Sequence, residues 1–165
     1  AVGNEIGNED DNTAIQKGLP NGTNPVGFTG IATYSQLRST FAAADVPNIF
    51  VSHGQTLLLL AEARERGWIT TGTAEQYFRD GVLSSINQLK LYNAPAALFN
   101  DAANATYAAT TLTFPATGTA RMQAINEQYY ISSFLDGYEP HANWRRSGYP
   151  ALTAINFAGN YTGFL

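Results

Sequence analysis

Two helical segments in close succession constrain the fold of this chain more than any other feature. The first begins at Ser52, whose hydroxyl can cap the free N–H groups of a helix while Gln55, three residues on, reaches back to the cap. It ends at Gly67, and the second segment follows a short link, with Thr73 as its cap and Gln76 in the matching position. Because the link is so short, we predict an antiparallel helical hairpin.

The side chains of the two segments predict a closely packed pair. The second has apolar residues at helical spacing, which are Phe78, Val82, Ile86 and Leu89. In the first segment, apolar residues lie on most sides of the helix, so we expect burial on most sides; they are Leu57 to Ala61 and Ala63. We expect its last turns to be more solvent-exposed, because they contain Glu62, Arg64, Glu65 and Arg66. Small residues permit the close backbone approach of stacked helical-hairpin repeats; these are Ala61, Ala63, Ala74 and Gly81.

The remaining segments complete a single region over residues 1–165, divided by their composition. Residues 1–34 are rich in Gly and Asn, so we predict a loop-rich amino-terminal segment there. Residues 35–91 contain the hairpin. Before it we predict a short helix over 35–45, which Ser35 caps and Pro47 ends. Residues 92–118 predict a variable, irregular loop in which Ala96 to Ala103 could form a helical turn. Residues 119–165 predict a helical carboxy-terminal part, with one helix over 119–135 and a short one from Pro140 to before Gly148.

Composition excludes several classes of function. The net charge is -4, and the nine Lys and Arg residues are scattered apart from two close pairs, so the chain lacks the basic stripe that nucleic acid binding requires. Without cysteine it has no disulfide, thiolate metal site, cysteine nucleophile or lipid-anchoring cysteine. No apolar run approaches the length of about 20 residues that spans a bilayer. No signal peptide is present, so we expect any export signal to be removed or to lie outside this sequence.

Catalytic and metal sites find little support in the sequence. Ser52 and His53 point in different directions on a helix, which favours capping over Ser–His catalysis. With only two histidines in the chain, His53 and His141, a zinc site needs carboxylates from distant segments, and we expect both to be structural. The acidic cluster over 8–12 lacks the spacing of a calcium loop and is interpreted as solvated. We expect no cofactor.

Paired carboxylates raise the question of glycoside hydrolysis. Glu62 and Glu65 lie on neighbouring helical positions, but each has an arginine nearby in the sequence. We therefore interpret them as ion-paired helix residues.

Aromatic and amide side chains in predicted loops could contact a sugar. Tyr92 and Tyr107 are the candidates for stacking, together with Asn104, and Phe28 lies in another loop. For each of these aromatics a role in the core or in anchoring a loop is the alternative. Three glycosylation triplets, which begin at Asn21, Asn104 and Asn160, are common by chance in so Asn- and Thr-rich a chain.

A compact motif near the carboxy terminus predicts a packed corner. Two adjacent guanidiniums, Arg145 and Arg146, follow Trp144, and a rigid fork of donors that also stacks on aromatic rings suits a fixed buried junction. Gly148 and Pro150 then end the helix. We assign structural roles to these five residues.

Four ordered segments, taken together, resemble one family. They are Leu58–Trp68, Ala74–Ile86, Ile125–Ile131 and Glu139–Pro150, the last similar to a Glu-x-x-x-x-Trp-Arg-Arg-x-Gly-Tyr-Pro pattern. The family is SusD/RagB, the bacterial outer-membrane nutrient-binding lipoproteins. Residue 129 is Tyr where the family usually has Lys, and the chain stops before the family's closing motifs, so we expect an internal or carboxy-terminal piece of a larger domain.

The resemblance implies a mainly α fold of helical hairpins similar to tetratricopeptide repeats, packed with long irregular loops. It implies binding of a glycan or other nutrient at the cell surface, without catalysis, and delivery to a TonB-dependent outer-membrane transporter. The lipid anchor to the membrane would lie outside this chain. Two alternatives remain: a helical-repeat interaction module whose only partner is the transporter, and a glycoside hydrolase that uses carboxylates such as Glu62 or Glu127.

Overall fold

The computed structural model describes residues 14, 16–18, 33–35, 37, 39–92 and 99–153 of the chain. The chain divides into two compact units, one formed by residues 1–46 and 152–165 and the other by residues 47–151. Every candidate site residue that the structure describes lies in the second unit, so that unit carries the functional argument.

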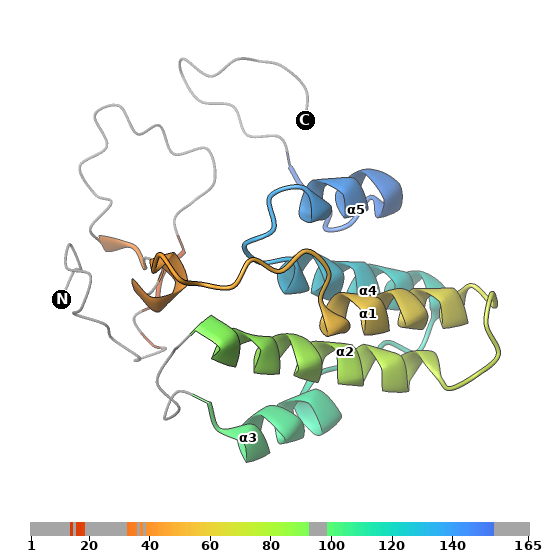
Figure 1. The fold of residues 1–165 in the computed structure, drawn as a ribbon. Helices are drawn as coiled ribbons and strands as arrows, with labels where there is room; N and C mark the ends of the chain where they lie inside the picture. The colour runs from red at the N-terminus through yellow and green to blue at the C-terminus, as the bar shows by residue number, and fades with distance from the viewer. Residues whose placement is uncertain are drawn as a thin grey trace. The chain divides into compact units, whose positions relative to one another are not determined.

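The unit over 47–151 is built from helices, and its described residues contain no strand. In chain order these are α1 (His53–Glu65), α2 (Ala74–Gln88), the 3-10 helix η3 (Leu89–Tyr92), α3 (Asp101–Thr106), the π-helix η5 (Tyr107–Thr111), α4 (Gly118–Ser132) and α5 (Glu139–Ser147). Helix α1 packs between α2 and α4, α3 and η5 lie against α2, and α5 packs on α4 (Figure 1). The predicted mainly α class is confirmed.

The capping signals at the start of the hairpin are confirmed in detail. Ser52 Oγ accepts a hydrogen bond from Gln55 N at 3.0 Å, and Gln55 Oε1 accepts one from Ser52 N at 2.8 Å. Thr73 Oγ1 accepts from Gln76 N at 3.1 Å and caps α2. Both caps satisfy donors that a helix start leaves without partners, which is why these local patterns locate the helices so well.

Two glycines let α1 and α2 approach each other closely. A Cβ atom on Gly81 would lie 2.9 Å from Leu58 Cγ, and one on Gly54 would lie 2.2 Å from Ser85 Oγ and 2.9 Å from the Gly81 carbonyl oxygen. The role of Gly81 follows the prediction, whereas Gly54 was not foreseen. The contact of two backbones fixes both the spacing and the register of the hairpin.

The core lies where α1, α2 and α4 meet, and it covers one face of α1 only. Its buried members are Leu58, Ala61, Phe78, Val82, Leu112, Ile125 and Tyr129. Phe114 packs on Phe78 with ring centroids 5.0 Å apart. The expectation that α1 is buried on most sides is confirmed only in part, because His53, Thr56 and Leu59 form an exposed face and Leu59 is 42% exposed. The buried residues of α1 instead form a single stripe, made of Gly54, Gln55, Leu58, Ala61 and Glu62.

The segment predicted as an irregular loop, 92–118, is partly helical. Asn100 Oδ1 accepts from Ala103 N at 3.0 Å and caps α3, which continues directly into η5. Arg79 on α2 donates to two carbonyl oxygens near the end of this segment, Ala108 O at 2.7 Å and Leu112 O at 3.0 Å. The arginine thereby satisfies acceptors that the end of η5 leaves open. Of the helical turn predicted over 96–103, residues 101–103 lie in α3, whereas residues 96–98 belong to the stretch 93–98, which lies outside the described residues.

The carboxy-terminal helices follow the prediction except at one end. Helix α4 ends at Ser132, three residues before the predicted Leu135. Ser132 Oγ and Ser133 Oγ both donate to the Tyr129 carbonyl oxygen at 2.8 Å, which offers the backbone an alternative to a further turn. Helix α5 has Pro140 in its first turn and ends at Gly148, whose φ of 77° is the left-handed conformation of a helix stop.

In the other unit, the helix predicted over 35–45 is only a 3-10 helix, η2 (Ser39–Ala42). Ser35 does not cap it. Its Oγ accepts from Lys17 N at 2.8 Å and donates to Gln16 Oε1 at 2.6 Å, so contacts with the preceding segment occupy this side chain. The acidic cluster over 8–12 lies outside the described residues. Within the described part of the chain, no helix is both long enough and apolar enough to span a membrane.

We predict that Gly54→Ala destabilises the protein by about 1–2 kcal/mol, because forcing the helices apart costs more than the roughly 1 kcal/mol that alanine contributes to helix stability. Chemical denaturation measured by circular dichroism would test this. Gly137→Ala is the matched control, since a Cβ there meets nothing within 4 Å. Equal stability of the two variants would contradict the close approach.

Candidate functional site

A buried carboxylate is the starting point of the site. Glu62 continues the inner stripe of α1, one turn after Leu58, and is only 3% exposed. The expectation that it marks a wetter turn is therefore wrong. A charge removed from water needs ionic or hydrogen-bonding partners of its own, so the surroundings of Glu62 have to supply them.

Two arginines supply those partners. Arg146 from α5 forms a two-pronged pair with Glu62, in which Nη1 donates to Oε1 and Nη2 donates to Oε2 at 2.8 Å. Arg66, one turn further along the chain, donates from Nε to Glu62 Oε1 at 2.8 Å. The planar fork of a guanidinium matches both oxygens of a carboxylate, and lysine lacks this geometry.

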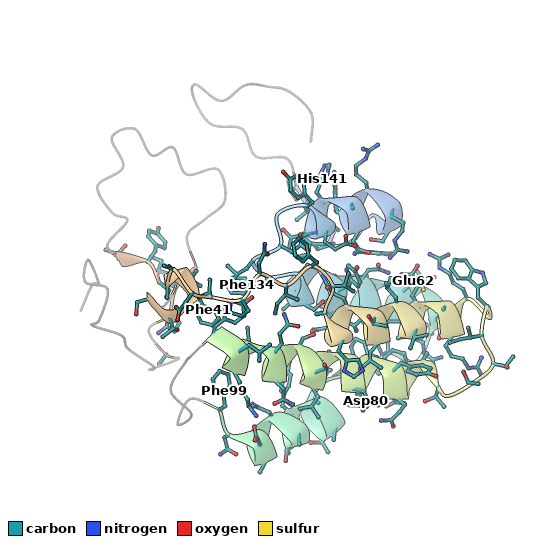
Figure 2. The ribbon with its side chains drawn as sticks, in the orientation of Figure 1. Phe41, Glu62, Asp80, Phe99, Phe134 and His141 are labelled. Carbon is teal, nitrogen blue, oxygen red and sulfur yellow. The ribbon has the colours of Figure 1, made fainter. Side chains whose placement is uncertain are left out.

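The same guanidinium of Arg146 also contacts two buried amides. Its Nη2 donates to Asn143 Oδ1 at 2.6 Å and to Asn126 Oδ1 at 3.1 Å. Asn126 in turn donates from Nδ2 to Met122 O at 2.9 Å within α4. We call Glu62, Arg66, Asn126, Asn143 and Arg146 the polar clamp, because together they join α1, α4 and α5. Figure 2 labels Glu62 on α1 and His141 on α5.

The polar clamp keeps its central groups charged. Burial alone raises the pKa of Glu62, but the hydrogen bonds from Arg146 and Arg66 outweigh it and leave this pKa below its ordinary value. The hydrogen bond to Glu62 likewise raises the pKa of Arg146, against the opposing effect of burial. A carboxylate stabilised in this way is a poor proton donor, whereas a glycosidase acid needs a raised pKa.

A second set of polar contacts lies next to the clamp. Tyr129 Oη donates to Glu139 Oε1 at 2.7 Å, and burial, followed by this hydrogen bond, raises the pKa of Tyr129. Gln55 Nε2 donates to Ser133 Oγ at 3.1 Å, which joins the start of α1 to the end of α4. The tyrosine that stands where the resemblance predicts lysine thus has a half-buried carboxylate as its partner.

An open pocket lies beside the polar clamp, between the end of α1, the start of α4 and the end of α5. Its volume is about 390 Å³. Its lining includes two clamp arginines and an amide together with Glu65, Thr119, Ser147 and Tyr149. Trp68 lies against one of the lining residues: the guanidinium carbon of Arg66 is 5.2 Å from its ring centroid, and 72% of the tryptophan is exposed. The pocket therefore combines donors and acceptors with a nearby exposed ring.

The five residues of the predicted corner occupy different environments. Arg146 lies in the clamp, with 43% of its side chain exposed, whereas Arg145 is exposed and forms no part of the clamp. Trp144 is half-buried, with its ring 6.0 Å from that of His141. Gly148 ends the helix, and Pro150 is half-buried after a cis peptide bond. The expected buried junction thus has one guanidinium at its centre, because adjacent helical residues point in different directions.

The three candidates for ligand contact are not equivalent. Tyr92 is only 4% exposed and belongs to the interior, because η3 follows α2 directly and turns this residue inward. Asn104 is half-buried on α3, and Tyr107 is 41% exposed at the start of η5. These last two are three residues apart on a continuous helical segment, so they occupy neighbouring positions on its surface.

The residues weighed for catalysis have structural partners. Glu65 Oε2 accepts from Arg121 Nη1 at 3.3 Å, which together with the clamp agrees with the interpretation of Glu62 and Glu65 as ion-paired. His53 Nδ1 lies 3.1 Å from Ser84 Oγ on α2, while Ser52 caps α1. Among the described residues, no group of three or more His, Asp or Glu side chains could hold a metal ion.

Four residues that shape the site were missed in the sequence. Asn126 and Asn143 are buried, at 1% and 2% exposure, and no local pattern separates them from the many other asparagines. Arg79 and Trp68 lie in the segments that resemble the family, but no site role was predicted for either of them. A signal existed for Trp68 only, as an aromatic residue directly after a helix stop at Gly67.

Comparison with known proteins places these features in a wider context. The family model described as "Starch-binding associating with outer membrane" matches residues 4–163. A solved structure described as a chitin-binding protein has 29% sequence identity and a TM-score of 0.72, over 81% of this chain and 28% of that one. Another, described as Bacteroidetes AC2a SusD-like, has 30% sequence identity and a TM-score of 0.69, over 77% of this chain and 24% of that one. The chain thus spans about a quarter of the length of both. No curated protein is significantly similar to it.

We predict that Arg146→Ala lowers the free energy of unfolding by about 2 kcal/mol, because it leaves Glu62 and two amides without their shared donor. The loss is smaller than for a fully buried pair, since Arg66 still contacts Glu62 and the Arg146 side chain is partly exposed. Arg145→Ala is the matched control and is expected to change stability by less than about 0.5 kcal/mol. Urea denaturation of both variants measures the difference, and equal losses would refute the clamp.

We also predict a pH signature of Glu62. Its lowered folded pKa contributes stability above about pH 4.3, the pKa of an unfolded glutamate, and this stability is lost as pH falls through the folded value. Glu62→Gln should therefore be less stable than wild type at pH 7, by about 1–3 kcal/mol, with a gap that narrows at pH 3. Glu127→Gln serves as control, since Glu127 accepts a hydrogen bond from Gln123 rather than from an arginine. A gap for Glu62→Gln that stays constant with pH would contradict this assignment.

Proposed function

Because the chain belongs to the SusD-like family described as starch-binding associating with outer membrane, we propose that it serves non-catalytic binding of a nutrient glycan at the bacterial cell surface. The observation that carries this proposal is the extent of the family match, from residue 4 to residue 163. The similar structure described as a chitin-binding protein supports a polysaccharide as the ligand.

We further propose that the whole protein passes its ligand to a TonB-dependent outer-membrane transporter. A lipid anchor outside this chain would hold it to the membrane. Both roles belong to the longer protein, since this chain spans about a quarter of the similar structures.

Binding without catalysis agrees with the state of the carboxylates. Glu62 is covered and held ionised by two arginines, and Glu65 contacts Arg121. Glycoside hydrolysis requires one carboxyl group that can donate a proton and a second that can attack or activate water. The ion pairs of Glu62 and Glu65 suit neither role, so this pair favours binding over hydrolysis.

For ligand contact, the surface of α3 and η5 is the better of the regions considered in the sequence. Tyr107 offers a partly exposed ring to the apolar face of a sugar, and Asn104 offers both a donor and an acceptor to its hydroxyl groups. Arg79 fixes this segment through the Ala108 and Leu112 carbonyl oxygens, which reduces the conformational entropy that binding would cost. Tyr92 has no place in this surface because it is buried.

We predict that Tyr107→Ala weakens glycan binding about tenfold, the effect of losing one stacked ring. Calorimetric titration of the whole chain with soluble starch and with chitin oligosaccharides would measure it. Tyr138→Ala is the matched control, because Tyr138 is 90% exposed and lies at the start of α5. Wild-type protein that binds neither these glycans nor a wider polysaccharide array would defeat the proposed function. Unchanged binding by Tyr107→Ala would defeat only this contact surface.

One observation favours the alternative of a protein-interaction module. Apolar side chains are exposed near the start of α1 and the end of α4, two places that the Gln55–Ser133 hydrogen bond holds together. They are Phe50 at 82%, Val51 at 74%, Ile131 at 61% and Leu135 at 47% exposure. Exposed apolar surface of this kind marks protein contacts. Stable co-purification with the transporter that does not depend on sugar, without glycan binding, would favour this alternative.

A further inference from the structure

We propose that the pocket between α1, α4 and α5, together with Trp68, forms a binding subsite for one neutral sugar ring. The inference rests on the proposed function, because it takes the ligand to be a glycan. It adds a second contact region, separate from Tyr107, and a ligand chemistry. The structural roles assigned to the residues from Trp144 to Pro150 imply neither this contact region nor this ligand chemistry.

The size and lining of the pocket suit a hydroxylated ligand. At about 390 Å³ it lies within the usual range of small-molecule sites. Three residues with hydroxyl groups line it, Thr119, Ser147 and Tyr149, together with Glu65 and Arg66. A sugar hydroxyl both donates and accepts hydrogen bonds, so it can use this mixture fully.

Trp68 provides a flat apolar surface next to these polar groups. The Arg66 guanidinium lies over its ring at 5.2 Å, yet 72% of the residue remains exposed. Arg66 therefore orients the indole without covering it. The C–H groups of a pyranose ring can pack on such an exposed aromatic face while the hydroxyl groups at its edge reach hydrogen-bonding partners.

Arg66 links the aromatic surface to the pocket. Its Nε is committed to Glu62, but its Nη1 and Nη2 have no hydrogen-bond acceptor among the described residues. These two donors belong to a residue that lines the pocket. A bound hydroxyl group would satisfy them with little rearrangement, since the clamp already fixes the guanidinium.

The charges of the pocket favour a neutral ligand over an anion. Arg66 and Arg146 share the carboxylate of Glu62, so most of their charge is already compensated. Glu65 lines the pocket as a carboxylate, and its Oε1 lies 3.4 Å from the position of a Cβ on Gly118, at the start of α4. Glu65 is in turn paired with Arg121, so its charge is compensated as well. A neutral ligand needs no charged partner of its own, so it suits this set of paired charges better than a sugar acid does.

The test uses the whole chain and four disaccharides: cellobiose, maltose and N,N′-diacetylchitobiose, which are neutral, and digalacturonate, which is anionic. Contact with the ring is followed through the indole N–H resonance of Trp68 by NMR, and the affinities of wild type and variants are measured by calorimetric titration. The chain has two tryptophans, so a Trp144→Phe variant assigns that resonance. We expect at least one neutral disaccharide to shift the Trp68 signal and to bind about tenfold more weakly to Trp68→Ala.

Matched variants separate this inference from the proposed function. Tyr138→Ala removes a more exposed ring outside the pocket and should bind as wild type does. Wild-type binding that Trp68→Ala leaves unchanged would overturn the subsite while the proposed function stands. Tighter binding of digalacturonate than of any neutral disaccharide would overturn the neutral ligand class. If wild type binds no glycan of any kind, both proposals fall.

Discussion

The pairing of Glu62 with Arg146 is the interaction on which the arrangement of the helices depends. Among the residues of α5 only Asn143 is fully buried, so this helix is attached to the bundle through its polar side chains rather than through an apolar stripe. An apolar surface tolerates sliding, whereas a two-pronged ion pair with amides at its edge has one good geometry. The buried charge thus fixes the position of α5 more than it adds to stability. Buried ion pairs often contribute little net stability, and specifying one arrangement of helices is the role that fits this junction.

Arginine has a related role elsewhere in the same unit. Arg79 binds carbonyl oxygens at the end of η5, and Arg121 donates to the Pro115 carbonyl oxygen at 2.8 Å while its guanidinium lies over Phe114. Irregular backbone leaves acceptors without partners, and buried acceptors must be satisfied. The chain over residues 108–115 therefore keeps a defined path through arginine side chains on the two flanking helices.

The sequence predicts what local chemistry decides. The starts of α1 and α2 and the end of α5 follow from Ser52, Thr73 and Gly148, because a cap and its partners lie within a few residues of each other. The burial of Glu62 could not be predicted in this way, since its main partner lies 84 residues further along the chain. Helix α3 could be predicted only in part. Asn100 followed by Asp101 is a local signal for a helix start, but the surrounding Ala, Thr and Asn residues favoured a loop.

The candidate site shows why architecture and binding are hard to separate in this unit. Arg66 and Arg146 line the pocket, but both are bound to Glu62, so any change to them also alters the junction of the helices. Trp68 differs from them: its ring is largely exposed, and the clamp is complete without it. The same holds for Tyr107, whose segment Arg79 and the Asn100 cap already fix. The residues proposed for ligand contact could therefore change while the clamp stays fixed, because exposed side chains on a rigid scaffold can vary without disturbing its packing.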